Sequence, residues 1–393
     1  MLIHIAYKCR LYPNREQETA LSRQFGACRF VYNHFLRQRI DFHAEHKDSQ
    51  GKKGLTFVDT SAMLTRLKKE QEFAWLNEVA NHPLQQSLLN LDKAYNGFFN
   101  RRAKFPRFKN KRSKQSFRIA DPKRFRIGNN TLFVQKIGTI RMVVHRIVEG
   151  APKLVVVSRT TTGKFFASIV CEQETPDPIH TSNKEIGIDL GLRSFLTTSY
   201  GEKVEHPKHL IKAAKRLARL QRRIDRRKPG SNRREKARRA VAIQHEKVTN
   251  RRMDFLHKLS SRLVRENQTI HAESLNVKGM LANHRLARRI SDSGWSEFLR
   301  QLDYKERWSG GCLDQVDRFY PSSKRCHICG RINEALKMSD REWRCVGCGT
   351  IHDRDRNAAI NILNFRQVGR EPPESTPREI PDGESPNLET ASR

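Results

Sequence analysis

The sequence predicts a multidomain protein that combines a strand-rich part, long helices and a small metal-bound module. Its 393 residues exceed what one hydrophobic core usually takes, so two or three domains are expected. The stretch ETPDPIHTSN at 174–183 carries two prolines and little apolar content, as linkers do. Two closely spaced cysteine pairs stand between 326 and 348. The predicted class is therefore α/β with additional β structure, and a new domain begins near residue 184.

The first hundred residues are predicted to be one strand followed by helices. Residues 3–13 alternate loosely and end in a proline, which favours a strand. Asn14 and Gln17 then have the spacing of a capping box, and apolar residues recur at helical intervals after them. Further apolar stripes at 59–100 predict more helices, in which we expect Trp75 to be core rather than a base-stacking platform.

Residues 101–118 form a basic segment with nine Lys or Arg and no acid. Phe105, Phe108 and Phe117 are interleaved with these cations, a pattern typical of a surface that contacts phosphates and stacks on bases, and the sequence leaves core packing of these rings about equally open. Residues 119–172 return to short strands, with a turn at Thr162-Gly163 that indicates a hairpin. The amino-terminal half therefore has the order strand, helices, strands.

The carboxyl-terminal half alternates between strands and helices. The predicted elements are strands and a hairpin at 185–205, two long helices over 208–265 with a turn at 228–232, a strand at 269–275, a helix at 294–307, a strand at 312–321 and a closing helix from about 356. Residues 367–393 hold five prolines and six acids without hydrophobic periodicity, which predicts a disordered tail.

The charge of the chain predicts a polyanionic partner. Lys plus Arg number 76 against 42 for Asp plus Glu, which gives a net charge of +34. This is more than solubility requires, so nucleic acid is the expected partner. A membrane surface is the alternative polyanion, but no apolar run approaches the roughly 18 residues of a spanning helix, and no signal peptide is present. We therefore expect a soluble, intracellular protein.

The cysteine pairs predict a zinc ribbon. Two Cys-x2-Cys motifs, each followed by glycine, are separated by 15 residues and comprise Cys326, Cys329, Cys345 and Cys348. The alternative is four ordinary unpaired cysteines, as expected for the scattered Cys9, Cys28, Cys171 and Cys312 in a reducing compartment. Four thiolates fill the coordination sphere, so the zinc is structural and contributes on the order of 10 kcal/mol to local folding. His327 and His352 are the alternative ligands.

A set of acids points to a second metal site. Asp189 in IGIDLGL and Glu273 in TIHAESL are charged residues inside predicted strands, and Asp353 and Asp355 precede the closing helix. Each alone is compatible with an ordinary capping or edge carboxylate. Together, in a basic domain, they are the type of set that holds two Mg²⁺ ions for phosphodiester hydrolysis.

Several motifs, in their order along the chain, resemble one known family. GIDLGL, AESLNVKGM, VDRFYPSSKRCHICG and CGTIHDRDRNAAINIL are similar to the RuvC-like nuclease and zinc ribbon of TnpB, the RNA-guided nuclease of bacterial insertion sequences. YKCRLYPNREQ, FGACRFVYN and FPRFKNKRSKQSF resemble its amino-terminal half. The resemblance extends from residue 1 to about 366.

The resemblance implies a domain order. It implies a wedge β-barrel preceding an RNase H-like (RuvC) nuclease domain into which the zinc ribbon is inserted. The implied parts are a split wedge β-barrel at 1–15 and 101–180, a helical recognition insert at 16–100, the RuvC-like domain at 184–325, the ribbon at 326–349, the last RuvC-like helix at 350–366 and the disordered tail at 367–393.

The resemblance also implies an activity and its cofactors. The catalytic triad of the family maps onto Asp189, Glu273 and Asp355, with Asp353 as the alternative third acid. These residues are expected to bind two Mg²⁺ ions, or Mn²⁺. The implied partners are a noncoding guide RNA and target double-stranded DNA that is cleaved beside a short target-adjacent motif. The alternatives are a nuclease-inactive RNA-guided repressor and a transposase.

Two basic segments are the expected nucleic-acid contacts. Residues 208–239 contain 15 basic and two acidic side chains, so solvation alone would leave strong repulsion. The individual candidates, taken from this segment and from 101–118, are Arg107, Lys109, Lys111, Arg112, Arg222, Arg223, Arg226 and Arg227. The sequence leaves the oligomeric state open.

Overall fold

The computed structural model describes residues 2–47, 54–175, 180, 182–337 and 339–365. The chain divides into two compact units, Met1–Pro176 and Asp177–Arg393, and each is described by itself. The predicted tail at 367–393 lies outside the described residues. Among the described helices, none is long and apolar enough to cross a membrane.

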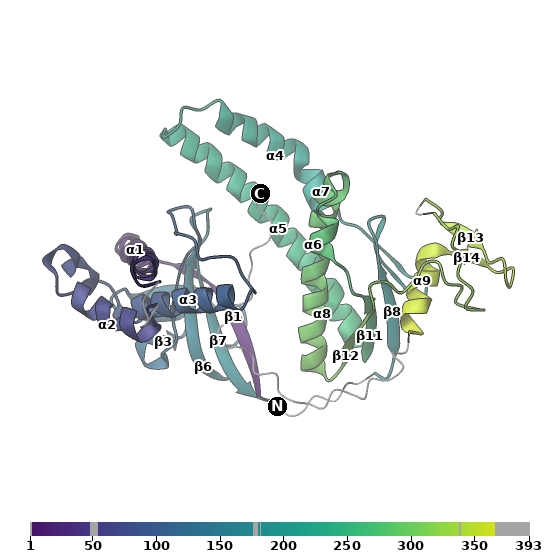
Figure 1. The fold of residues 1–393 in the computed structure, drawn as a ribbon, viewed down its shortest axis with the longest axis horizontal. Helices are drawn as coiled ribbons and strands as arrows, with labels where there is room; N and C mark the ends of the chain where they lie inside the picture. Colours follow the sequence, from purple (N-terminus) through teal and green to yellow (C-terminus); the bar gives the residue numbers. More distant parts are fainter. Residues whose placement is uncertain (1, 48–53, 176–179, 181, 338, 366–393) are drawn as a thin grey trace. The chain divides into compact units, whose positions relative to one another are not determined.

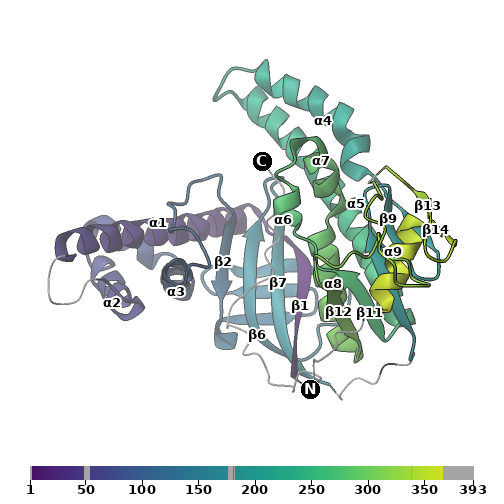
Figure 2. The same cartoon turned by 45° about the vertical axis from the view of Figure 1, so that its right-hand side comes forward.

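An antiparallel sheet of seven strands dominates the first unit, with the order β2-β6-β7-β1-β5-β4-β3. It curls into a nearly closed, barrel-like sheet (Figure 2). β1 (Leu2–Tyr12) is central because it pairs with β7 (Phe165–Glu174) on one side and β5 (Gly138–Val143) on the other. The remaining strands are β2 (Gln115–Ile119), β3 (Phe125–Gly128), β4 (Thr131–Val134) and β6 (Ala151–Arg159).

Helices fill the interval between β1 and β2. They are α1 (Arg15–His46), α2 (Phe57–Leu67), the 3₁₀ helix η1 (Gln71–Asn77) and α3 (Asn81–Phe99), and a short 3₁₀ turn, η2 (Pro122–Arg124), precedes β3. The predicted capping box is confirmed, since Asn14 Oδ1 accepts from the N–H of Gln17 and Gln17 Oε1 accepts from the N–H of Asn14. Buried leucines of α1, α2 and α3 belong to the same hydrophobic core as the sheet.

In this unit the structure decides one aromatic residue that the sequence left open and contradicts the prediction for another. Phe117 is only 4% exposed and packs on Phe25 with ring centroids 5.4 Å apart, because alternation along β2 turns it toward the core. Trp75 is 39% exposed, because its turn is the short η1 rather than a helix packed on both sides. Phe105 and Phe108 remain exposed, as expected for the basic segment.

A mixed sheet of five strands organises the second unit, with the order β10-β9-β8-β11-β12. β8 (Glu185–Leu190), β11 (Thr269–Glu273) and β12 (Cys312–Val316) are parallel neighbours, whereas β9 (Ser194–Thr198) and β10 (Lys203–Glu205) continue the sheet antiparallel. The predicted hairpin after residue 185 is therefore confirmed. The crossovers between the parallel strands are helical.

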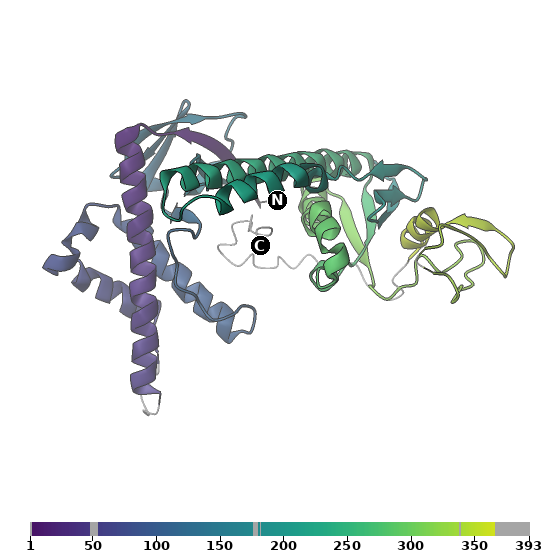
Figure 3. The same ribbon diagram turned by 90° about the horizontal axis from the view of Figure 1, so that it is seen from above.

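Helices cover both faces of this sheet. α8 (Trp295–Ser309) and the end of α5 (Asn232–Glu266) bury Phe298, Leu302 and Leu263 against one face. α9 (Arg354–Leu363) lies on the other face, beside β8 (Figure 1). α4 (His209–Asp225) pairs with α5 as a long helical hairpin (Figure 3), and α6 (Val277–Met280) and α7 (His284–Ser293) are short helices that the sequence patterns did not predict.

The cysteine module is small and is built on a two-stranded sheet. β13 (Glu342–Arg344) pairs antiparallel with β14 (Ile351–Asp353), and an isolated bridge joins Arg325 to Ile332. Its core consists of Cys326, Leu336, Trp343 and Cys345. β14 runs directly into α9, so the module and the last helix form one continuous path.

Candidate active site and metal centre

Two acids lie side by side at the carboxyl ends of neighbouring parallel strands. β8 and β11 pair with Ala272 opposite Ile188, so Glu273 is the next position beside Asp189. Side chains alternate between the faces of a strand, which places Asp189 on the same face as Gly187, and Glu273 on the same face as His271, the partner of Gly187. Both carboxyl groups therefore belong to the face that α9 covers.

The close approach of α9 to β8 depends on a glycine. A Cβ at Gly187 would lie 2.1 Å from the carbonyl oxygen of Ala359 and 2.7 Å from the backbone nitrogen of Leu363. The helix therefore rests on the strand backbone, and its first turn carries Asp355. This packing brings a residue from the end of the chain to two strand acids that precede it by more than 80 positions.

The electrostatics of Asp189 report the proximity of the other two acids. Burial is the main cause that raises the pKa of Asp189 well above its ordinary value, and the negative charges of Glu273 and Asp355 raise it further. Arg354 and Arg341 oppose this shift. Burial and the charges of these two acids, from β11 and α9, thus make ionisation of the Asp189 carboxyl group on β8 unfavourable without added positive charge.

Neighbouring side chains hold two of the three acids. The hydroxyl of Ser322 donates to Glu273 Oε1 at 2.5 Å, and Ser322 is 5% exposed. Arg341 Nη1 lies 3.5 Å from Asp355 Oδ1. Neither Ser322 nor Arg341 was predicted from the sequence, because a hydroxyl and an arginine in a loop give no periodic signal.

Asp353 occupies a different environment from Asp355. It is the N-cap of α9, where it accepts from the N–H of Arg356 at 2.9 Å, and it pairs with Lys203 Nζ at 2.7 Å. Burial alone would raise the pKa of Asp353, but the hydrogen bonds from Lys203 and the backbone outweigh it, and the pKa is lowered. Its carboxylate is thus already satisfied by a cation and a helix terminus.

The four cysteines of the ribbon converge as the spacing predicts. All four Sγ atoms lie within 4.8 Å of one another. Cys326 and Cys348 are 3.6 Å apart, and Cys329 and Cys345 are 3.5 Å apart. Zn–S bonds of about 2.3 Å in a tetrahedron require S–S separations of about 3.8 Å. The donor set and its geometry therefore fit a structural zinc ion.

The surroundings of these thiols shift their pKa values in different directions, since burial raises the pKa of Cys326 to about 11. Hydrogen bonding to the side chain of Thr350 and then to its backbone lowers the pKa of Cys348 to about 6. His352 Nε2 lies 3.1 Å from Cys326 Sγ, and His327 Nδ1 lies 2.9 Å from Asn357 Oδ1. The two histidines therefore have partners within the ribbon and α9, while the four sulfurs alone complete a coordination sphere.

Comparison with known proteins gives this fold and these motifs a family. The family model OrfB_IS605, "Probable transposase", matches residues 168–284, a Cas12f1-like TNB domain model matches 295–362, and a model described as a helix-turn-helix domain matches 1–48. A "Putative RNA-guided DNA endonuclease" of Streptomyces pristinaespiralis is 44% identical over 363 residues, covering 91% of this chain and 88% of that protein. The chain belongs to the TnpB family.

A second relative and a solved structure agree with this family. "Putative RNA-guided DNA endonuclease InsQ" of Escherichia coli K12 is 35% identical over 373 residues, which are 91% of each chain. The cryo-EM structure of a Cas12f1-sgRNA-target DNA complex matches with a TM-score of 0.54 at 12% identity, over 93% of this chain and 99% of that one. At this identity the match shows the fold, which this TnpB chain shares with Cas12f1.

One family description differs from the observed structure. The described part of residues 1–48 in this TnpB chain is the strand β1 and the single 32-residue helix α1. It is not a pair of helices joined by a turn. The name helix-turn-helix therefore does not describe the shape of this segment.

The basic candidates of this TnpB chain are exposed residues, with the exception of Arg227. Arg107, Lys109, Lys111 and Arg112 occupy the loop between α3 and β2, and Lys109 Nζ lies 3.8 Å above the Tyr32 ring. Arg222, Arg223 and Arg226 are exposed at the end of α4. Arg227 is half-buried and its carbonyl accepts from Arg234, which ties it to the turn between the helices.

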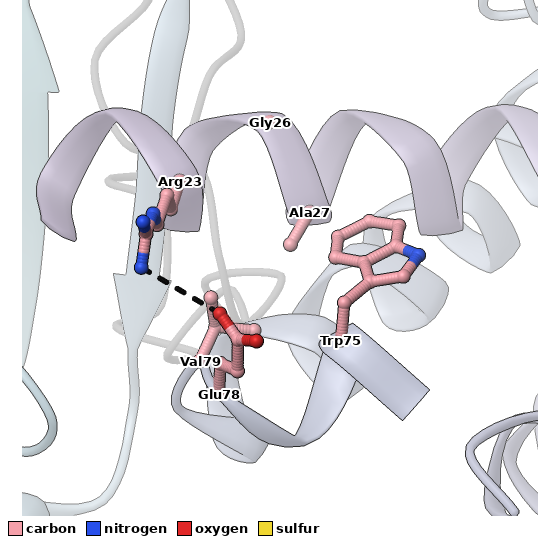
Figure 4. A pocket seen from close by; sticks show the side chains of 6 residues that line it. All are labelled: Arg23, Gly26, Ala27, Trp75, Glu78 and Val79. Atoms are coloured by element: carbon pink, nitrogen blue, oxygen red, sulfur yellow. Dashed lines mark ion pairs between the residues drawn. The ribbon is translucent and has the colours of Figure 1, made fainter. Parts of the chain in front are cut away.

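A surface hollow in the first unit is separate from these sites. It has a volume of about 450 Å³ and is lined by α1, η1 and the segment that follows η1 (Figure 4). Trp75 forms one wall, and Arg23 and Glu78 pair with each other at 3.6 Å. Because its charged groups satisfy each other, we assign no ligand to it.

Proposed function

We propose that this chain is an RNA-guided endonuclease that cleaves double-stranded DNA beside a short target-adjacent motif. A noncoding guide RNA is its partner, and Asp189, Glu273 and Asp355 hold two divalent cations for phosphodiester hydrolysis. The observation that carries this proposal is the convergence of three acids from distant segments, in which Glu273 and Asp355 raise the pKa of Asp189. Relatives whose names state RNA-guided DNA cleavage support it.

The donor set fits Mg²⁺ or Mn²⁺. Hard cations prefer carboxylate oxygens, and the acid pocket formed by these three residues, where burial and two neighbouring acids disfavour ionisation of Asp189, is stabilised by positive charge. When bound, two such ions would activate a water and stabilise the leaving 3′ oxygen. The four ribbon cysteines are soft donors without an open position, so zinc belongs to the ribbon and has a structural role.

The residues of the chain have separable roles in this proposal. Asp189 is fixed by the sheet, Glu273 is oriented by Ser322, and Asp355 is presented by the first turn of α9. Arg341, 3.5 Å from Asp355, adds a positive group that can approach a phosphate. Asp353 caps α9 and pairs with Lys203, so we assign Asp355 rather than Asp353 to the metal.

We further propose that the two compact units carry the two halves of this activity. The first unit corresponds to the wedge β-barrel with its helical recognition insert, and the second to the RuvC-like domain with the ribbon. The basic loop with Arg107 to Arg112 and the α4 terminus with Arg222 to Arg227 would contact the phosphates of guide RNA or DNA. In such effectors base pairing reads the sequence and the protein reads shape.

One experiment separates this proposal from its alternatives. The protein is purified with its copurifying RNA, the RNA is sequenced, and the complex is incubated with a matching linear DNA and Mg²⁺. Cut ends that disappear with Asp189→Asn, while DNA binding persists, are expected. Binding without cutting by the unmodified chain would indicate a repressor, and joined products would indicate a transposase.

A further inference from the structure

One segment contacts both elements that carry the acids. The residues Pro321–Cys326 lead from β12 into the first cysteine pair, and Ser322 within them donates to Glu273 Oε1 at 2.5 Å. A hydroxyl that donates to a carboxylate at this distance is a charge-assisted hydrogen bond. It occupies one oxygen of Glu273, fixes the rotation of the carboxyl group and leaves Oε2 for another partner.

The same segment is fastened to α9 by two asparagines. Asn357 and Asn361 are four residues apart, so both lie on one face of the helix, and both are buried. Asn361 Nδ2 donates to the carbonyls of Ser322 at 2.8 Å and of Arg325 at 2.6 Å. Asn357 Nδ2 donates to the carbonyl of Arg325 at 2.8 Å.

Asn357 also reaches the first zinc knuckle. Its Oδ1 accepts from the backbone N–H of His327 at 3.1 Å and lies 2.9 Å from His327 Nδ1. His327 directly follows Cys326, whose N–H donates to Arg331 and whose carbonyl accepts from Gly330. The knuckle conformation and the position of α9 are therefore tied through Asn357, two residues beyond Asp355.

We propose that Ser322, Asn357 and Asn361 are positioning residues that set the distance between Glu273 and Asp355 and thereby the affinity of the acid pocket for divalent cations. The proposal rests on the function proposed above. Its physical basis is that Ser322 bonds to the strand acid through its side chain and to the helix through its carbonyl. One residue thus joins the two metal-binding elements, and Asn357 extends the connection to the ribbon.

A purely structural role would give a different result from a positioning role. Loss of a structural hydrogen bond lowers the melting temperature or the zinc content, and cation binding falls only with them. Loss of a positioning bond changes the affinity for cations while the fold persists, since partners outside the ligand set typically affect metal affinity by about 10-fold to 100-fold. The test therefore measures both quantities on the same samples.

The test uses the full chain with its copurified RNA and Mn²⁺ as the probe. Mn²⁺ binding is measured by electron paramagnetic resonance in the unmodified chain and in Asp189→Asn, Ser322→Ala and Asn357→Ser. Asn364→Ser is the matched control, because Asn364 is exposed at the C-cap of the same helix. Zinc content and melting temperature are measured for each variant.

The expected result is Mn²⁺ affinity about tenfold weaker in Ser322→Ala and Asn357→Ser, at unchanged zinc content and melting temperature. The half-saturating Mg²⁺ concentration for cleavage rises by a similar factor, while the rate at saturating Mg²⁺ changes less. Wild-type affinity in both variants, or loss that only accompanies unfolding, overturns the inference and leaves the proposed function standing. Mn²⁺ binding that does not depend on Asp189 overturns the proposed function as well.

Discussion

At the scale of single residues, the surroundings of a carboxyl group decide its chemistry. Asp353 and Asp355 are two positions apart in the sequence, yet Asp353 pairs with Lys203 and caps a helix, whereas Asp355 acts on the pKa of Asp189. Asp353 is the extended N-cap residue that ends β14, whereas Asp355 lies in the first turn of α9, so the two side chains have different surroundings. The two acids are therefore expected to respond differently to neutralisation.

Neutralising each acid tests this difference. We expect Asp355→Asn to reduce DNA cleavage by about 100-fold or more, because a metal ligand is lost. Asp353→Asn should change cleavage only a few-fold, because Asn is as good an N-cap as Asp and only the ion pair with Lys203 is lost. Cleavage rates at saturating guide and Mg²⁺ measure both. Equal losses in the two variants would contradict the assignment of Asp355.

A second residue-scale feature concerns stability rather than catalysis. Glu306 on α8 is 0% exposed, and neither carboxyl oxygen has a hydrogen-bond partner among the described residues. Burial raises the pKa of Glu306 to about 8. The folded chain therefore holds this carboxyl group protonated at neutral pH, where the unfolded chain has it ionised.

The sign of the pH dependence follows from this raised pKa. The contribution of Glu306 to folding stability is fully present at pH values below the ordinary pKa of a glutamate. It falls as the unfolded chain ionises, and it is lost as the pH rises through about 8. We expect Glu306→Gln to raise the melting temperature by a few degrees at pH 8 and to leave it nearly unchanged at pH 4.5. Thermal unfolding at the two pH values measures this. Destabilisation at pH 8 would show that Glu306 is ionised and paired.

At the scale of elements, the ribbon and α9 form one unit that presents Asp355. β14 passes directly into α9, and Asn357 and Asn361 bond to the first knuckle and the segment leading into it. The helix lies on β8 because Gly187 has no side chain. The position of the third acid is thus fixed from two sides, by the sheet and by the cysteine ribbon.

Removing the zinc should therefore reduce cleavage indirectly. Cys345→Ser takes one of four ligands from the ribbon, so we expect loss of bound zinc and a rate of cleavage lower by about tenfold or more. Zinc content by mass spectrometry and cleavage with the same guide measure it. Cys312→Ser, a cysteine outside the ribbon, serves as the control. Full cleavage by a zinc-free variant would refute the link between ribbon and active site.

At the scale of the whole molecule, the main feature is the large net positive charge. The net charge of +34 includes the 15 basic side chains of residues 208–239, most of them exposed on the α4–α5 hairpin. The apolar side of α4, which carries Leu217, Leu220 and Ile224, packs toward α5. The basic side chains on the opposite side are therefore available to solvent or to a partner. Binding through phosphates releases counterions and depends steeply on salt.

The salt dependence of RNA and DNA binding tests this interpretation. We expect affinity to fall by about 10³ or more between about 50 and 200 mM salt, as for six or more phosphate contacts. Replacing Arg222, Arg223 and Arg226 by Gln should reduce the slope of log K against log salt by about one for each arginine that binds a phosphate. Replacing the uncharged neighbours Gln221 and Asn232 by Ala should leave the slope unchanged. A salt-insensitive affinity would count against a phosphate-binding surface.

The sequence by itself determined the local features of this protein. The capping box of α1, the strand that carries Asp189 and the cysteine pairs depend on spacing within a few residues, which periodicity and motifs report directly. The alternative left open at Phe117 and the wrong prediction at Trp75 both concern which face of an element is covered. That depends on distant packing partners, so no local pattern contains it.

Only the tertiary structure decided how the acids that the motifs name are surrounded and what holds them. The resemblance favoured Asp355 over Asp353 without a physical reason, and the packing of α9 on Gly187 together with the cap at Asp353 supplies one. Ser322, Asn357 and Asn361 became visible only through their hydrogen bonds, because bonds across about 30 to 50 positions leave no periodic trace in the chain. Residue types and their spacing indicate the chemistry of the candidate site, whereas the geometry of the site depends on the packing of α9 against the sheet.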